Sequence, residues 1–182
     1  MARGLRKTVA LVGMMGAGKS AIGKALAARL GVPFLDSDAE IEKAADRSIA
    51  EIFARDGETF FRDKETQVIG RLLDTEQAVL STGGGAFLSP VNRAMIAERG
   101  VAVWLKVDRE TLWQRVRHKD TRPLLRTANP YQTLCDLVAA REPAYAQAGI
   151  VVEAQQDTSI DEMTDRVVAA LAAHGGILGD EA

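Results

Sequence analysis

The sequence predicts an α/β fold in which helices cover both faces of a five-stranded parallel sheet. Short apolar runs with the length of buried strands alternate with helical patterns along the chain, and this alternation is typical of parallel sheets. The chain has 182 residues, which is enough for one domain with a substantial core. We find no internal repeat, linker or second domain, so we expect a single domain with its core at about residues 7–173.

Five apolar runs are predicted to be strands. Because ligands gather beyond the C-terminal ends of parallel strands, the loops after the first three strands should meet in one crevice. These loops are Gly13–Ser20, Asp36–Asp38 and Thr82–Gly85. The predicted strands are Thr8–Val12, Pro33–Leu35, Ala78–Ser81, Val101–Val107 and Gly149–Val152.

Capping signals mark the helices between these strands. Proline follows a polar cap at Ser89 and at Asn129, which is typical of a first helical turn. Three serines are followed three residues later by glutamate, the pattern of a capping box: Ser37, Ser48 and Ser159. The tail after the last helix, residues 174–182, is predicted to be disordered.

Two segments are longer than simple connections. Residues 48–74 have a helical pattern that is broken near Asp56-Gly57, so residues 38–74 are expected to form a lobe beside the crevice. Residues 115–128 are predicted to form a flexible lid. The lid contains Arg115, Arg117, Lys119, Arg122 and Arg126, and such a cluster in a slightly acidic chain favours an anionic ligand.

Composition excludes several classes of function. The net charge of −2 gives no sign of nucleic-acid or membrane-surface binding. One cysteine and two histidines are too few for a zinc cluster, and no apolar run has the length of a membrane span. The basic N-terminus leads directly into the first strand, unlike a signal peptide, so we expect a cytoplasmic protein.

The segment Gly13–Ser20 matches the phosphate-binding P-loop pattern G-x-x-x-x-G-K-[S/T]. It lies between a predicted strand and a predicted helix, where this motif belongs. Its glycines let backbone N–H groups surround a phosphate, and the helix N-terminus adds positive potential. Lys19 can reach the terminal phosphates and Ser20 can bind Mg²⁺. The sequence therefore predicts a site for a nucleoside triphosphate.

Two further loops carry candidate residues for a second substrate. Asp36 and Asp38 follow the second strand, where one carboxylate can face Mg²⁺ and the other a substrate; a polar helix cap is the alternative. The third strand ends without an acidic residue, which favours Asp36 for the metal. The run Gly83-Gly84-Gly85 permits close approach of a ligand, although a tight turn would also use glycine.

Three arginines are candidates for binding anions. Arg62 is followed one turn later by Glu65, and the pair is either a surface ion pair or a device that aims Arg62 at a ligand. Arg122 in the lid can neutralise phosphate charge, as arginine fingers do, unless it belongs to a solvated loop. Arg141 lies on the helix leading to Tyr145, where surface exposure is the default expectation.

Taken together, these residues resemble the shikimate kinases from about Lys7 to Val152. The resemblance implies transfer of the ATP γ-phosphoryl group to the 3-hydroxyl of shikimate, a step of aromatic amino acid biosynthesis. It also implies a monomer with the nucleoside-monophosphate-kinase-like fold and strand order 2-3-1-4-5. The motifs that carry the resemblance are Gly13–Ser20, Asp36-Ser37-Asp38, Gly57-Glu58 with Phe61-Arg62, Gly83-Gly84-Gly85, Arg122-Pro123-Leu124-Leu125, and Arg141 with Tyr145.

The resemblance also implies roles for individual residues. On the acceptor side, Asp38 holds the shikimate hydroxyls and acts as base, Arg62 and Arg141 clamp the carboxylate, and Gly84, flanked by Gly83 and Gly85, contacts the ring hydroxyls. On the nucleotide side, Ser20 and Asp36 hold Mg²⁺, the latter through water. The residues implied to bind ATP are Gly16, Ala17, Gly18, Lys19, Ser20, Ala21, Arg115 and Arg122. Of these, Arg115 stacks on adenine, and Lys19 and Arg122 complete the catalytic set with Asp38.

The chain departs from the family pattern at three places. Ala21 stands where Thr or Ser is usual, so a hydroxyl for the α-phosphate is missing and ATP affinity is expected to be modestly lower. Gly149 replaces a common Asp, and Asp157-Thr158-Ser159 matches no pattern. The alternatives to a shikimate kinase are a gluconate kinase or another small-molecule P-loop kinase, or a catalytically silent nucleotide-binding module.

Overall fold

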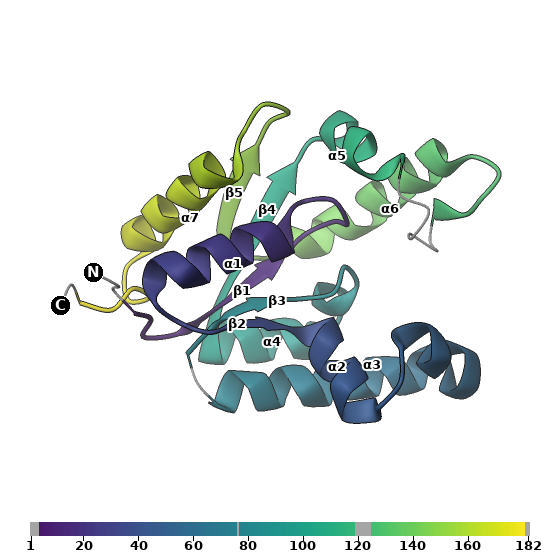
Figure 1. Ribbon diagram of the computed structural model, residues 1–182, viewed down its shortest axis with the longest axis horizontal. Coiled ribbons are helices and arrows are strands. Elements are labelled where there is room, and N and C mark those ends of the chain that lie inside the picture. The colour runs from purple at the N-terminus through teal and green to yellow at the C-terminus, as the bar shows by residue number, and fades with distance from the viewer. Residues whose placement is uncertain (1–3, 76, 119–124, 181–182) are drawn as a thin grey trace.

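The computed structural model describes residues 4–75, 77–118 and 125–180. Its five strands form one parallel sheet with the order β2-β3-β1-β4-β5, as predicted (Figure 1). The central strand β1 is buried along its whole length, which explains its continuous apolar run. The strands are β1 (Thr8–Val12), β2 (Phe34–Asp36), β3 (Val79–Ser81), β4 (Gly100–Val107) and β5 (Ile150–Ala154).

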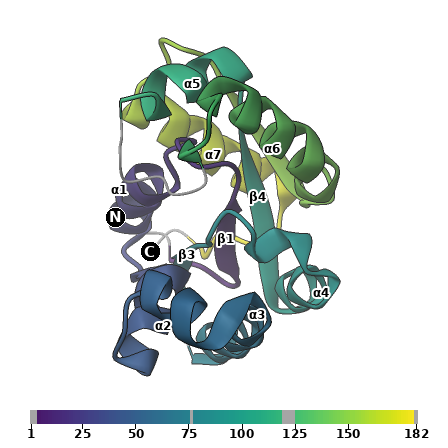
Figure 2. The same cartoon turned by 90° about the vertical axis from the view of Figure 1, so that its right-hand side faces the viewer.

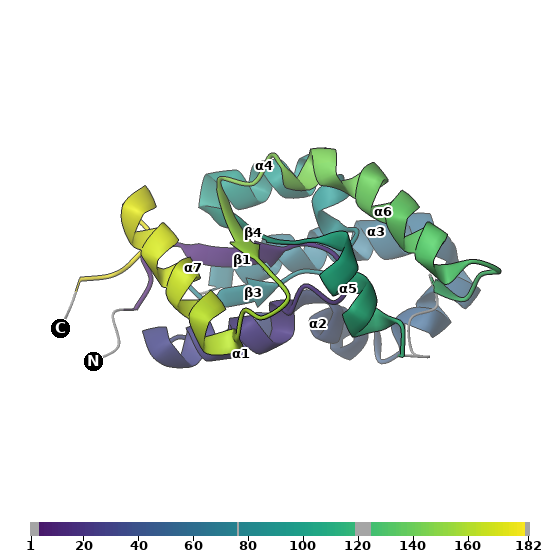
Figure 3. The same ribbon diagram turned by 90° about the horizontal axis from the view of Figure 1, so that it is seen from above.

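Helices cover both faces of the sheet and give the expected three layers. Helices α1 and α7 lie on one face, and α3, α4 and α6 lie on the other (Figure 3). No helix of the described chain is both long and apolar enough to span a bilayer. The helices in this part of the chain are α1 (Lys19–Leu30), α2 (Ser37–Ala45), α3 (Ile49–Thr75), the 3₁₀ turn η1 (Ala86–Leu88), α4 (Pro90–Arg99), α5 (Arg109–Val116), α6 (Pro130–Tyr145) and α7 (Ile160–His174).

Four of the predicted helix caps are confirmed and one is wrong. The side chains of Ser48, Ser89, Asn129 and Ser159 each accept a hydrogen bond from the backbone N–H three residues later. The exception is Ser37. Strand β2 ends one residue later than predicted, so α2 is capped by Asp36, whose Oδ1 accepts from the Ala39 N–H at 3.1 Å. The Ser37 hydroxyl instead accepts from the Gly83 N–H at 3.3 Å.

Helices α2 and α3 pack against each other beside the sheet (Figure 2). Their contact has a small apolar core of its own, built around Ile41, Ile52 and Phe61. The break predicted near Asp56-Gly57 is present, because Gly57 has φ +88° within α3. This left-handed conformation suits glycine, and it redirects the helix so that its second part, which carries Arg62, runs along the crevice.

The first residues of the segment predicted as a lid, residues 115 and 116, are helical. Helix α5 continues to Val116, so Arg115 belongs to its last turn rather than to a flap. Residues 119–124, which include Lys119 and Arg122, lie outside the described residues. After them Leu125 is buried in the main core.

The prediction of a disordered C-terminal tail is wrong for residues 175–180. Ile177 is 2% exposed and packs in the main core. Its carbonyl accepts from the Arg6 N–H at 2.8 Å, and the Gly179 N–H donates to Gly4 at 3.1 Å. Residues 4–6 and 177–179 therefore lie side by side (Figure 1). Local sequence signals missed this pairing because the partners are far apart along the chain.

We predict that Ile177→Ala destabilises the fold by about 2–5 kcal/mol, since it removes buried methyl groups and leaves a cavity. Ile160→Ala is the matched control, because Ile160 is 50% exposed and its truncation should cost less than about 0.5 kcal/mol. Urea unfolding of both variants measures the difference. Equal stabilities would show that the tail contributes nothing to the core.

Candidate active site

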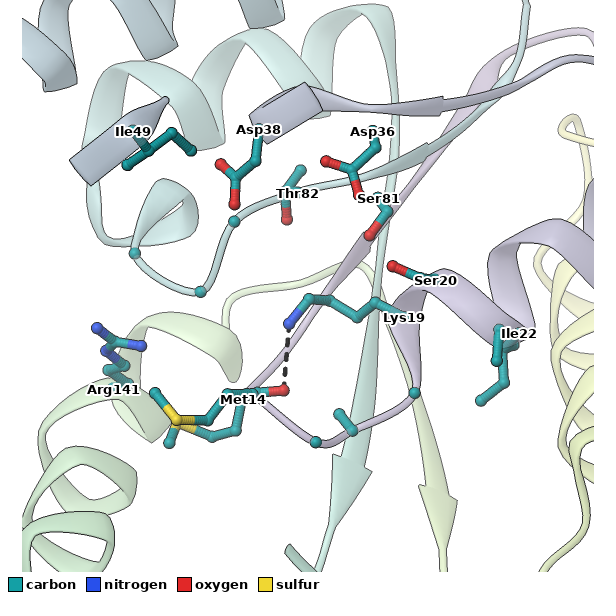
Figure 4. Close-up of a pocket in the computed structure, with 18 of the residues that line it drawn as sticks. Met14, Lys19, Ser20, Ile22, Asp36, Asp38, Ile49, Ser81, Thr82 and Arg141 are labelled. Carbon is teal, nitrogen blue, oxygen red and sulfur yellow. Dashed lines mark hydrogen bonds between the residues drawn. The ribbon is translucent and has the colours of Figure 1, made fainter. Parts of the chain in front are cut away.

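The loops after β1, β2 and β3 line one pocket at the C-terminal ends of these strands, as the sequence predicts (Figure 4). Its walls come from the P-loop, the start of α2, both parts of α3, the glycine run after β3 and helices α5 and α6. Residues 154 and 158–160 close the side nearest α7. Segments that are far apart in the sequence therefore build a single cavity.

The P-loop, Gly13–Ser20, has the geometry of an anion cradle. Gly16 and Gly18 have φ of +83° and +93°, so glycine is required at both. Helix α1 begins at Lys19, and its N-cap Gly18 makes no side-chain capping bond, which leaves the first helical N–H groups available to a phosphate. The Lys19 ammonium donates to the carbonyl of Gly13 at 2.5 Å and to that of Met14 at 3.1 Å (Figure 4). Lys19 therefore lies across the phosphate cradle.

The glycine run after β3 brings three charged side chains together. A methyl group on Gly83 would lie 2.8 Å from Asp38 Oδ1, and one on Gly84 would lie 2.8 Å from Arg141 Nη1. A methyl group on Gly85 would lie 2.6 Å from Arg62 Nη2. None of the three glycines has a positive φ. They are therefore needed for space: each leaves room for a different charged group.

Glu65 holds Arg62 in position from below the pocket surface. Arg62 Nη1 donates to Glu65 Oε1 at 2.9 Å, and Glu65 is 1% exposed. Burial raises the pKa of Glu65, against the opposing pull of Arg62. The pair is thus not a surface ion pair, and Arg62 is aimed by a buried carboxylate. Glu58, on the solvent side, lies 3.7 Å from Arg62 Nε.

Asp38 is free to face the pocket because Asp36 caps helix α2. Its carboxylate points toward the glycine run (Figure 4). Burial raises the pKa of Asp38 above its ordinary value, and the neighbouring Asp36 carboxylate adds to this effect while Lys19 opposes it. A carboxylate with a raised pKa is a better proton acceptor than an exposed one, so Asp38 has the chemistry of a general base.

Arg141 is buried, contrary to the default expectation of surface exposure. It is 8% exposed, and its guanidinium faces Gly84. One turn later on α6, Tyr145 donates its hydroxyl hydrogen to the Gly84 carbonyl at 2.6 Å. The spacing of four residues between Arg141 and Tyr145 was the available signal that both lie on the same helical face.

The residues expected to bind Mg²⁺ suit an ion that keeps several water molecules as ligands. The described residues contain no group of three or more acidic, His or Cys side chains that could enclose a metal. Ser20 is exposed in the pocket, and Asp36 also lines it. Because Mg²⁺ in phosphate sites is held by one or two protein oxygens together with phosphates and water, this sparse set fits it.

The remaining nucleotide-side residues lie around the P-loop. Gly16, Ala17, Gly18 and Ala21 line the pocket, and Ala21 is exposed there without a hydroxyl. Arg115 Nη1 donates to the Gly16 carbonyl at 3.0 Å, which places α5 against the loop.

Comparison with known proteins identifies the family. The family model for shikimate kinase matches residues 15–172. A shikimate kinase from Ruegeria pomeroyi is 64% identical over 97% of this chain and 91% of its own length, and one from Cereibacter sphaeroides is 62% identical over 98% and 88%. The structure of the shikimate kinase from Acinetobacter baumannii in complex with shikimate superposes with a TM-score of 0.85 at 38% identity, covering 92% of this chain and 93% of that one. The similarity covers nearly the whole sequence, including the P-loop, the glycine run and the two arginines. The chain therefore belongs to the shikimate kinase family.

Proposed function

We propose that this shikimate kinase binds shikimate among Asp38, Arg62 and Arg141 and phosphorylates its 3-hydroxyl with ATP held at the P-loop. One observation carries the assignment of the acceptor site: the run of three glycines opens space for one carboxylate and two guanidinium groups side by side. Shikimate is a small polyol with a carboxylate, and its two kinds of polar group match these two kinds of side chain.

In the proposed reaction the 3-hydroxyl oxygen of shikimate attacks the γ-phosphorus of ATP, and the bond from this phosphorus to the bridging oxygen of ADP breaks. Asp38 accepts the hydroxyl proton. Lys19 and the N–H groups at the start of α1 balance charge on the phosphates. Phosphoryl transfer depends mainly on such alignment and neutralisation, which is what the pocket residues provide.

The carboxylate of shikimate is proposed to lie against Arg62 and Arg141. Both guanidinium groups offer paired N–H donors, and Glu65 fixes one of them. Gly83, Gly84 and Gly85 line the floor next to them, with Gly84 near the ring hydroxyls. Close backbone approach of this kind is possible only where the side chain is absent.

Mg²⁺ is proposed to bind between Ser20 and Asp36 together with the ATP phosphates, where it would supply positive charge to the transferring group. Arg115 is proposed to stack on adenine, and Arg122 to contact the phosphates from the lid. We further propose a cytoplasmic monomer that binds only small-molecule substrates.

The first test is the choice of acceptor. We expect ADP release, measured in a coupled assay, to require shikimate and to be negligible with gluconate, AMP or no acceptor. Turnover with gluconate or AMP alone would identify a different kinase. An absence of turnover with every acceptor would indicate a silent nucleotide-binding module.

Gly85→Ala tests the paired-arginine clamp. The backbone of Gly85 is compatible with alanine, since its φ and ψ are −94° and −7°, but the added methyl group would push Arg62 aside. We expect KM for shikimate to rise about 10–100-fold, which corresponds to the loss of a charge-assisted hydrogen bond, with KM for ATP nearly unchanged. The control is Gly70→Ala in α3, where the methyl group would meet Met95 Sδ at 3.4 Å, an ordinary contact. A normal KM for shikimate in Gly85→Ala would remove Arg62 from the acceptor site.

Asp38→Asn tests the proposed base. We expect kcat to fall by about 10²–10⁴-fold, the usual contribution of a general base, while ATP binds normally by calorimetry. Asp63→Asn, at an exposed position of α3, is the control and should retain full activity. Near-normal turnover by Asp38→Asn would leave Asp38 as a structural residue only.

The raised pKa of Asp38 adds a pH dependence to this test. Because the base must be ionised, kcat/KM for shikimate should fall on the acidic side with a pKa above that of an ordinary aspartate. The raised pKa also means that folding favours protonated Asp38, so its contribution to stability is present at low pH and is lost as pH rises through the folded-state pKa. Asp38→Asn should therefore unfold at a temperature equal to or above that of the wild type near neutral pH. A lower temperature there would contradict this.

A further inference from the structure

Tyr145 lies behind the acceptor site and does not line it. It is the last residue of α6 and is 1% exposed. Its ring packs against Trp104 of β4 with centroids 5.8 Å apart. Its hydroxyl donates to the Gly84 carbonyl at 2.6 Å and lies 4.0 Å from Met14 Sδ of the P-loop, and the Arg141 guanidinium is close enough to lower its pKa.

This hydrogen bond determines which way a backbone N–H group points. The peptide bond between Gly84 and Gly85 is trans, so the Gly85 N–H points away from the Gly84 carbonyl. The carbonyl points into the protein toward Tyr145, whereas Gly84 and Gly85 themselves line the pocket. Within the described part of the chain the Gly85 N–H donates to no acceptor.

We propose that Tyr145 is a positioning residue for the acceptor substrate: by holding the Gly84 carbonyl, its hydroxyl keeps the Gly85 N–H directed into the pocket beside Arg62 and Arg141. The inference rests on the proposed function, because it takes an oxygen of shikimate as the acceptor of that N–H. Glycine has no side chain to restrain its backbone, so a peptide between two glycines needs an outside contact to keep one orientation.

Helix α6 sets the distance between this peptide and Arg141 as well. Arg141 and Tyr145 are one turn apart and both reach Gly84: the guanidinium lies next to where a methyl group on Gly84 would be, and the hydroxyl bonds the Gly84 carbonyl. Burial raises the pKa of Tyr145 against the opposing effect of Arg141, and because even an unperturbed tyrosine keeps its proton near neutral pH, the hydroxyl is a donor there.

Tyr145→Phe tests the inference, because it keeps the ring packing and removes only the hydroxyl. We expect KM for shikimate to rise about tenfold, the usual loss for one hydrogen bond of this strength, with KM for ATP and kcat changed less than twofold. Tyr131→Phe is the matched control: Tyr131 is on the same helix, is 38% exposed and packs edge-on against Trp113. It should leave all three constants unchanged.

Several outcomes would overturn the proposal. An unchanged KM for shikimate in Tyr145→Phe, or an equal rise in both KM values, would mean that Tyr145 serves only the fold. If the wild type phosphorylates shikimate, either of these results contradicts only the role given to Tyr145. A wild type that is inactive with shikimate would overturn the proposed function as well.

A second measurement keeps the Tyr145 hydroxyl in place and therefore does not depend on the stability of Tyr145→Phe. The chain has two tyrosines, so 3-fluorotyrosine incorporated into Tyr131→Phe labels Tyr145 alone. We expect its fluorine resonance to shift on titration with shikimate and to saturate near KM. A resonance that does not respond to shikimate would contradict coupling between Tyr145 and the acceptor site.

Discussion

The site depends on one stretch of backbone without side chains. Gly83, Gly84 and Gly85 follow β3, and each leaves space for a charged group from a different helix: Asp38 from α2, Arg141 from α6 and Arg62 from α3. Strand β3 lies between β1 and β2, so its C-terminal end is close to both the P-loop and Asp36. The parallel sheet thus brings the P-loop and the glycine run to the same edge.

Bringing these charges together has a cost in stability. Asp38 and Glu65 both have raised pKa values, and burial is the largest cause in each case. Their ionised forms are therefore less favourable in the fold than in water. The opposing effects of Lys19 on Asp38 and of Arg62 on Glu65 reduce this cost. The arrangement is consistent with a base that needs a raised pKa and an arginine that needs a fixed direction.

Much of the fold followed from local signals. Alternating apolar runs and helical patterns predicted the layers, and polar residues before prolines or acidic residues marked helix starts correctly at Ser48, Ser89, Asn129 and Ser159. The errors arose where a distant contact decides the outcome. Ser37 bonds to Gly83 rather than capping α2, and Ile177 joins the core because it pairs with the other end of the chain.

The sequence by itself determined that a phosphate-binding loop joins the first strand to the first helix, since spacing and residue type are local properties. Through its resemblance to the shikimate kinases, it also marked Asp38, Arg62, Gly84 and Arg141, each in a separate short motif, as candidates for one acceptor site. Only the tertiary structure decided that Arg62 is aimed by a buried Glu65, that Arg141 is buried over Gly84, and that Tyr145 holds the Gly84 carbonyl. The reason is physical. Burial and contact depend on which helices the sheet brings together, and the spacing of residues within one segment does not specify which other segments pack against it.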